Sequence, residues 1–161
     1  MLVNEGTSQR RLVTATVQTL TLAWSPDSAA FLVNDRMASD VENAYIYDVR
    51  TLDRLDLREH VVTTVLAHEP GSKRFLPGVN PAASHSYFHG LRWLDARHVE
   101  LRLFGHTNGT ANPKPDPSDP DSNVIPGDCF DLRYRISRDG AVEKLSQRVA
   151  SLSSPACNSI E

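Results

Sequence analysis

The chain has 161 residues and a mass of 17.8 kDa, which is the size of one domain. Its 17 basic and 20 acidic residues give a net charge of −3, and 40% of its residues are hydrophobic. This composition excludes a disordered chain, a membrane-embedded protein and the basic surface that nucleic-acid binding needs. We therefore expect one soluble domain over residues 1–161, with no nucleic-acid partner and no membrane insertion.

Several segments alternate hydrophobic and polar residues with a period of two, which is typical of half-buried antiparallel strands. In His98–Phe104, for example, every second residue is Val or Leu, and in Phe130–Ser137 every second residue is apolar or aromatic. The opposite faces carry arginines and carboxylates, which can pair across strands. We interpret these faces as solvated sheet surface and not as a nucleic-acid stripe. The predicted strands are Leu12–Ala23, Ala29–Asn34, Ala44–Val49, His98–Phe104, Phe130–Ser137 and Ala141–Gln147.

One helix is expected, over residues 57–68. Asp56 is a good N-cap, and Leu57, Val61 and Val65 fall at helical spacing before Pro70 ends the segment. We expect this short helix to pack on a sheet.

Two parts of the chain repeat one pattern when Trp24 is aligned with Trp93. Each copy has a tight turn after the tryptophan, then a strand, a connection, a further strand and a second turn. The copies cover residues 22–57 and 91–147. The residues expected to have structural roles in these turns are Trp24, Pro26, Asp27, Trp93 and Asp95.

The sequence Trp24-Ser25-Pro26-Asp27-Ser28, with Tyr45-Ile46-Tyr47-Asp48-Val49 and Arg50-Thr51 after it, resembles a blade of a WD-like or TolB-like β-propeller. Closed propellers have about four to eight blades, whereas this chain has room for two. The resemblance therefore implies a mainly β fold, with two blade-like antiparallel sheets packed in one domain beside one short α-helix. A fragment of a larger propeller is an alternative.

Residues 105–128 form a long loop inside the second copy and hold the whole net charge of the chain. One lysine and four aspartates give this loop a charge of −3, which leaves 16 basic and 16 acidic residues elsewhere. Five of the ten prolines lie here, so the loop should be extended and stiff. Long loops in compact domains are usually functional or disordered. We interpret this loop as a recognition element, with a merely solvated insertion as the alternative.

The same region supplies the candidate binding residues. Asp119, Asp121 and Asn123 match the first ligands of an EF-hand loop, but Val124 stands where the sharp turn needs glycine, so calcium is only an alternative. Two aromatic residues precede the second copy and are candidate anchors for a partner, with core packing as their other role. The predicted partner-binding residues are Asp116, Asp119, Asp121, Asn123, Tyr87 and Phe88.

Three histidines suggest a zinc site as a further alternative. His85 and His89 have HxxxH spacing, and His106 follows in the next predicted strand. The segment around the first two is expected to be extended, however, and residues four apart on a strand lie about 13 Å apart. We therefore assign no metal or other cofactor.

The two cysteines, Cys129 and Cys157, lie 28 positions apart and fit no metal or redox motif. Such a pair favours a disulfide that fixes the tail, residues 148–161. Disulfides persist in oxidising compartments, so we expect a periplasmic or otherwise exported protein. Because residues 1–6 lack the features of a leader, that leader would have been removed. A cytoplasmic protein with two reduced thiols is the alternative.

The chain has no nucleophile elbow, phosphate loop or dinucleotide fingerprint. We therefore predict a non-enzymatic protein-binding module, an inhibitor or immunity-type protein of a bacterial envelope. Its partner would be a toxin or envelope enzyme with a basic patch, bound by a monomer or homodimer. The alternative is a metal-dependent (zinc or calcium) ligand-binding protein or hydrolase that uses His85, His89 and His106.

Overall fold

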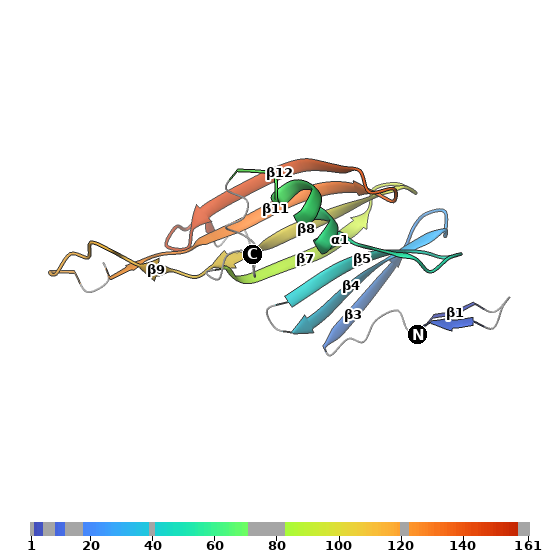
Figure 1. Ribbon diagram of the computed structural model, residues 1–161, viewed down its shortest axis with the longest axis horizontal. Helices are drawn as coiled ribbons and strands as arrows, with labels where there is room; N and C mark the ends of the chain where they lie inside the picture. The colour runs from blue at the N-terminus through green and yellow to red at the C-terminus, as the bar shows by residue number, and fades with distance from the viewer. Residues whose placement is uncertain are drawn as a thin grey trace.

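The computed structural model describes residues 2–4, 9–11, 18–38, 41–70, 83–119 and 123–157. As expected, the fold is mainly β with one short helical segment (Figure 1). The strands are β1 (Leu2–Asn4), β2 (Gln9–Arg11), β3 (Thr19–Trp24), β4 (Ala30–Ala38), β5 (Val41–Asp48), β6 (Arg54–Asp56), β7 (Ala83–Trp93), β8 (His98–Thr107), β9 (Thr110–Ala111), β10 (Val124–Ile125), β11 (Asp128–Ser137) and β12 (Val142–Ser151).

Eight of these strands form two antiparallel meanders. Strands β3, β4, β5 and β6 pair in chain order and make the first meander; β7, β8, β11 and β12 make the second. A short parallel pairing, Val41 with Ser86 and Glu42 with Tyr87, joins them. The two expected sheets are therefore parts of one mixed eight-stranded sheet in the described residues, and β1–β2 and β9–β10 form separate pairs.

Strand β7 is the main element that the alternation pattern did not identify as a strand. Its core-facing positions are Ser86, Phe88 and Gly90, so only one of the three is a large apolar residue. The predicted first strand, Leu12–Ala23, is described only from its C-terminal half, as β3, because residues 12–17 lie outside the described ranges.

The expected helix is present and begins where the N-cap predicts. Helix α1 (Leu57–Val61) has the amide of Glu59 donating to Asp56 Oδ1 at 3.0 Å. It continues as a π-helical turn, Val62–Leu66. The hydroxyls of Thr63 and Thr64 donate to the carbonyls four residues earlier, which competes with regular α-helical bonding there. Among the described helices none is long and apolar enough to cross a bilayer.

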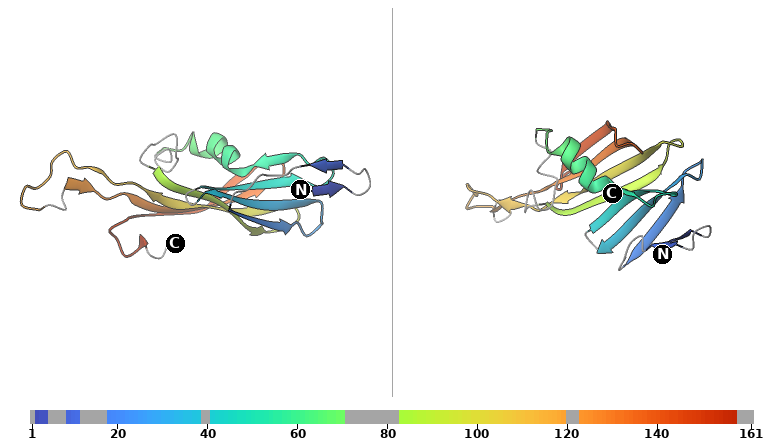
Figure 2. Two further views of the ribbon diagram at one scale, coloured as in Figure 1. Left: turned by 90° about the horizontal axis from the view of Figure 1, so that it is seen from below. Right: turned by 45° about the vertical axis from the view of Figure 1, so that its right-hand side comes forward.

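The core lies between the helical segment and the sheet, as Figure 2 shows from the side. Leu57, Val61 and Leu66 of the helical segment are fully buried. They pack against the alternating apolar residues of the second meander, which confirms the predicted inward faces of β8 and β11. Those residues are Val99, Leu101, Leu103, Phe130, Leu132, Tyr134 and Ile136, all with no exposed surface.

Beyond the two residue pairs that it forms with β5, strand β7 contacts the first meander through side-chain hydrogen bonds. The Asn34 amide donates to Gly90 O at 2.9 Å and accepts from Gly90 N at 2.7 Å. Trp93 Nε1 donates to Ala23 O at 3.0 Å. A Cβ at position 90 would lie 2.6 Å from Leu32 Cδ1, so a larger residue there would displace this core side chain. The edge of β7 therefore packs on the face of the first meander, and the two meanders meet at an angle.

Candidate functional site

The described residues of the acidic loop, 108–119 and 123–126, form a finger that projects from one end of the sheet (Figures 1 and 2). Its two arms are held together by β9 and β10, which pair Ala111 with Val124 and Thr110 with Ile125. One more bond, from Asn112 N to Asn123 O at 2.9 Å, continues the ladder toward the tip. Apart from half-buried Asn112, the described residues of the finger are exposed.

The base of the finger is held by hydrogen bonds, by a close backbone approach at Gly127 and by a cysteine pair. Thr107 Oγ1 accepts from the amide of Asp128 at 2.9 Å, and Leu152 N donates to Gly127 O at 2.8 Å. A Cβ at Gly127 would lie 2.0 Å from Thr107 O, so the two arms can approach only with glycine here. Cys129 and Cys157 are paired at disulfide distance, as predicted, with Cα atoms 5.8 Å apart.

The predicted binding residues of the finger are exposed where they are described. Asp116, Asp119 and Asn123 are on the surface, and Asp121 lies outside the described residues. Hydrogen bonds from the Ser118 hydroxyl and amide lower the pKa of Asp116, so this carboxylate stays ionised. Exposed apolar residues in the finger escaped the sequence prediction: Val124 and Ile125 are 54% and 47% exposed, although both lie in a strand.

The two predicted aromatic anchors have different environments. Phe88 is fully buried in the core, which confirms core packing, its alternative role, and leaves no exposed surface for an anchor. Tyr87 points to the opposite face of β7. There it lines a cavity of about 450 Å³.

The three histidines do not converge on one point. The rings of His85 and His106 stack with centroids 4.4 Å apart, whereas His89 Nδ1 hydrogen-bonds the Glu42 carboxylate. Within the described ranges, no group of three or more acidic, His or Cys side chains is placed to hold a metal ion. The structure therefore offers no arrangement in these ranges that the zinc alternative could use.

A groove lies in the angle between the two meanders. The 450 Å³ cavity beside Tyr87 and a smaller one of about 180 Å³ share Arg36 and Glu42 in their linings. The Tyr87 and Phe104 rings stack on the groove wall with centroids 5.1 Å apart. We call this feature the groove; the residues that line it are Thr19, Thr21, Asn34, Arg36, Glu42, Tyr87, His89, Arg102, Phe104, Gly105 and His106.

The open face of the second meander, beside the groove, is an ion-pair network. Asp131 is only 1% exposed and receives Arg102 Nε at 3.1 Å and Arg148 Nη2 at 2.6 Å. Burial alone would raise the pKa of Asp131, but hydrogen bonds from these two arginines outweigh it and hold the pKa low. Glu100 is likewise buried, between Arg92 and Arg133. The predicted cross-strand pairing is present; Asp131 and Glu100 are buried, whereas Glu143, which pairs with Arg135, is exposed as predicted.

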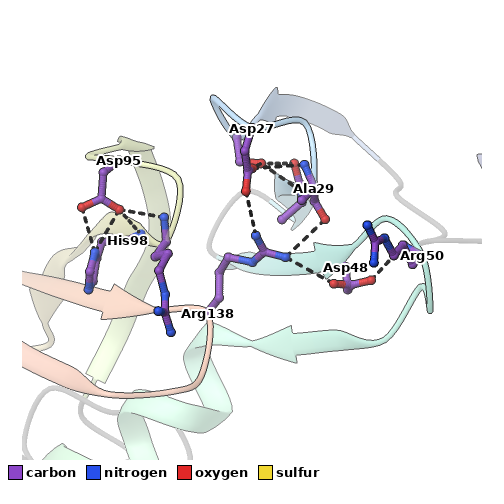
Figure 3. Close-up of polar contacts among 10 residues, drawn as sticks. Asp27, Ala29, Asp48, Arg50, Asp95, His98 and Arg138 are labelled. Atoms are coloured by element: carbon purple, nitrogen blue, oxygen red, sulfur yellow. Dashed lines mark hydrogen bonds and ion pairs between the residues drawn. The ribbon is translucent and has the colours of Figure 1, made fainter.

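The predicted structural turns meet at the end of the sheet opposite the finger (Figure 3). Asp27 Oδ1 accepts from Ala29 N at 3.1 Å, and Asp95 Oδ1 accepts from His98 N at 2.9 Å, so the two aspartates close equivalent turns. Arg138 of the second meander binds Asp27 Oδ2 at 3.4 Å and Asp48 Oδ2 at 3.2 Å. This cluster joins the two meanders, so Asp27 and Asp48 have a structural role as ion-pair partners of Arg138.

The remaining predicted structural residues differ in burial. Pro26 is exposed and begins a turn closed by Ser28 N donating to Ser25 O at 2.9 Å. Trp93 is half-buried and bonded to Ala23, but Trp24 is 52% exposed at the sheet edge, with its ring against Phe31. The aligned tryptophans therefore do not have the same surroundings.

No protein-family model, no curated protein and no solved structure matches this chain. Its function is therefore inferred from its own side chains.

Proposed function

We propose that the protein is a non-enzymatic binding module that neutralises a partner protein by inserting the finger into a basic cleft. The observation that supports this most strongly is the finger itself. It projects beyond the sheet, exposes Asp116 and Asp119, and stands on a base fixed by Gly127 and the Cys129–Cys157 pair. A long polar loop that served only as a connection would not need such a brace.

The finger combines two kinds of contact. Asp116 and Asp119 at its tip would steer it toward a basic patch and speed association. Val124 and Ile125, nearer the base, supply apolar surface that a partner can bury. Its prolines and paired arms hold the finger close to one shape, so little conformational entropy is lost on binding.

The pairing at the finger base also bears on location. A disulfide persists in an oxidising compartment, so this part of the proposal places the protein in a periplasm or another exported setting. There the partner would be an envelope enzyme or a toxin that crosses the envelope.

The first experiment identifies the partner by contact. A photo-crosslinking residue replaces Asp119 at the finger tip, and the matched control carries it at Arg50, an exposed turn residue that follows β5. In an envelope extract of the native cell, we expect one protein to crosslink from position 119 and not from position 50. An identical crosslinking pattern from both positions contradicts the finger as the binding element.

The second experiment measures the interaction with the purified partner. The variant Asp116→Asn, Asp119→Asn, Asp121→Asn should lower the association rate by about tenfold at low salt and by much less at high salt. The control, Asp53→Asn, Glu59→Gln, Glu143→Gln, makes the same charge change at exposed sites off the finger and should leave the rate unchanged. Val124→Ser with Ile125→Ser should mainly raise the dissociation rate. Equal rates for the finger variant and the control would refute the proposal, as would a partner whose activity is unaffected by saturating protein.

A further inference from the structure

The groove wall contains a layered stack of arginine and aromatic side chains. Arg36 Cζ lies 5.8 Å from the Tyr87 ring centroid, and Arg102 Cζ lies 4.3 Å from that of Phe104. Arg36 comes from β4 on one side of the ring pair, while Arg102 extends to Asp131 in β11 on the other side. The rings are therefore held between two guanidinium groups.

The surroundings of the stack carry an excess of positive charge. On the adjoining face, four arginines pair with two buried carboxylates, Asp131 and Glu100; the arginines are Arg92, Arg102, Arg133 and Arg148. Arg36 adds a cation on the other side of the groove and Glu42 the only lining carboxylate in the described ranges. A ligand for this groove should therefore be anionic.

The shape and side chains of the groove favour an extended peptide. Its two cavities, of about 450 and 180 Å³, share Arg36 and Glu42, so they adjoin and together make one larger space. Proline-rich segments in an extended conformation characteristically dock on grooves lined by aromatic side chains. Arginines beside such a groove select peptides with carboxylates next to the prolines.

We propose that the groove binds an acidic, proline-rich segment, and that its occupant is the finger of a second copy of this chain. The tip sequence, from Asn112 to Asn123, alternates prolines with aspartates and so has the chemistry that the groove selects. The body outside residues 105–128 is neutral, with 16 basic and 16 acidic residues, so finger and groove are the complementary charged parts. In this dimer each finger is covered by the second copy, so the dimer must dissociate before a finger can bind the partner protein of the proposed function.

The placement of the two features allows both contacts to form at once. Gly105 and His106 line one end of the groove, and the finger begins two residues later at Asn108. A surface that contains both the finger and the groove can pair with its copy about a two-fold axis, because each finger then enters the groove of the other copy. Such an interface closes at two copies and does not grow into a filament.

A peptide experiment tests the groove. A fluorescently labelled peptide of residues 108–126 is titrated with the full chain, and its anisotropy is followed. We expect saturable binding that weakens by about tenfold in Arg36→Glu, whose side chain is exposed, and stays within about twofold in the control Arg50→Glu. The peptide with Asn at 116, 119 and 121 should bind as weakly as a scrambled neutral peptide. No saturable binding, or equal loss in both arginine variants, overturns the proposal.

A charge-exchange experiment tests the second copy. Sedimentation velocity of the wild-type chain over a concentration series should show a monomer–dimer equilibrium. Arg36→Glu alone, and Asp116→Arg with Asp119→Arg alone, should both sediment as monomers. The chain with all three changes should again form dimers, because the exchanged charges complement each other, which a folding defect would not produce.

The outcomes separate the occupant from the site. A wild-type monomer at every concentration, or no recovery in the triple variant, overturns the second copy as the occupant even if the peptide binds. Partner capture through the finger is measured independently, so a monomeric chain that still binds its partner leaves the proposed function in place.

Discussion

The contact between Asn34 and Gly90 holds the two meanders at their angle, and its removal has a calculable cost. The Asn34 side chain is buried, and one amide both donates to Gly90 O and accepts from Gly90 N, at 2.9 and 2.7 Å. In Asn34→Ala both backbone groups lose this partner inside the protein. A buried polar group left unpaired costs about 1–3 kcal/mol, so with two such groups the variant should lose about 2–6 kcal/mol. That is a large part of the about 5–15 kcal/mol of a typical domain.

Asn34→Asp separates hydrogen bonding from packing. A carboxylate can still accept from Gly90 N, but its second oxygen faces the Gly90 carbonyl and repels it. At neutral pH this variant should therefore be no more stable than Asn34→Ala. The site favours the protonated carboxyl, which can donate to Gly90 O, so the folded-state pKa of the new side chain is raised. Stability relative to the wild type should recover as the pH falls through that pKa.

Urea unfolding followed by far-UV circular dichroism measures both variants. Thr21→Ala is the control, because Thr21 is the exposed cross-strand neighbour of Asn34 on β3 and should change stability by less than about 0.5 kcal/mol. An Asn34→Ala variant within about 0.5 kcal/mol of the wild type would refute the reasoning. So would an Asp variant more stable than the Ala variant at neutral pH.

Three further predictions concern the core, the open face and the finger base. Tyr134 is fully buried, and its hydroxyl has no hydrogen-bond partner in the described structure. In urea unfolding, Tyr134→Phe should therefore be as stable as the wild type or more stable by about 1 kcal/mol. A loss of stability above about 1 kcal/mol contradicts this prediction. Asp131 has a lowered pKa, so its ionised form stabilises the fold above the unfolded-state pKa of about 3.9. This contribution is lost as the pH falls through the folded-state pKa. Asp131→Asn should therefore flatten the acid limb of the stability–pH curve, and an unchanged limb would refute the prediction. The double variant Cys129→Ser, Cys157→Ser should lower stability by about 3–4 kcal/mol, as expected for opening a loop of 28 residues. Dithiothreitol should destabilise the wild type and leave this variant unchanged. Equal sensitivity of both proteins to dithiothreitol would show that the disulfide is not the source of the stability difference.

Local patterns predicted the elements whose two faces differ strongly in polarity. Strand β8 was predicted because Val99, Leu101 and Leu103 alternate with charged residues, and those three are fully buried. The helix was predicted from one capping aspartate and apolar spacing, and Asp56 does cap it. The cysteine pair was predicted from its number and spacing, and it is at disulfide distance.

Strand β7 shows why such patterns fail. Its inward position Gly90 is small because another element lies close against it: Leu32 and Asn34 contact Gly90 from the first meander. In the sequence, a small residue at a close tertiary contact interrupts the alternation of apolar and polar residues, just as a loop residue would. The alternation signal is therefore weakest where two parts of the chain approach most closely.

By itself, the sequence determined the composition of each strand face, the place of the helix and the acidic, proline-rich character of residues 105–128, because these are properties of neighbours along the chain. Only the tertiary structure decided that Arg36, Tyr87 and Phe104 share one groove and that Phe88, next to Tyr87, belongs to the core. The reason is physical: local periodicity states which side of a strand is apolar, but the partner of that strand depends on contacts between residues far apart in sequence.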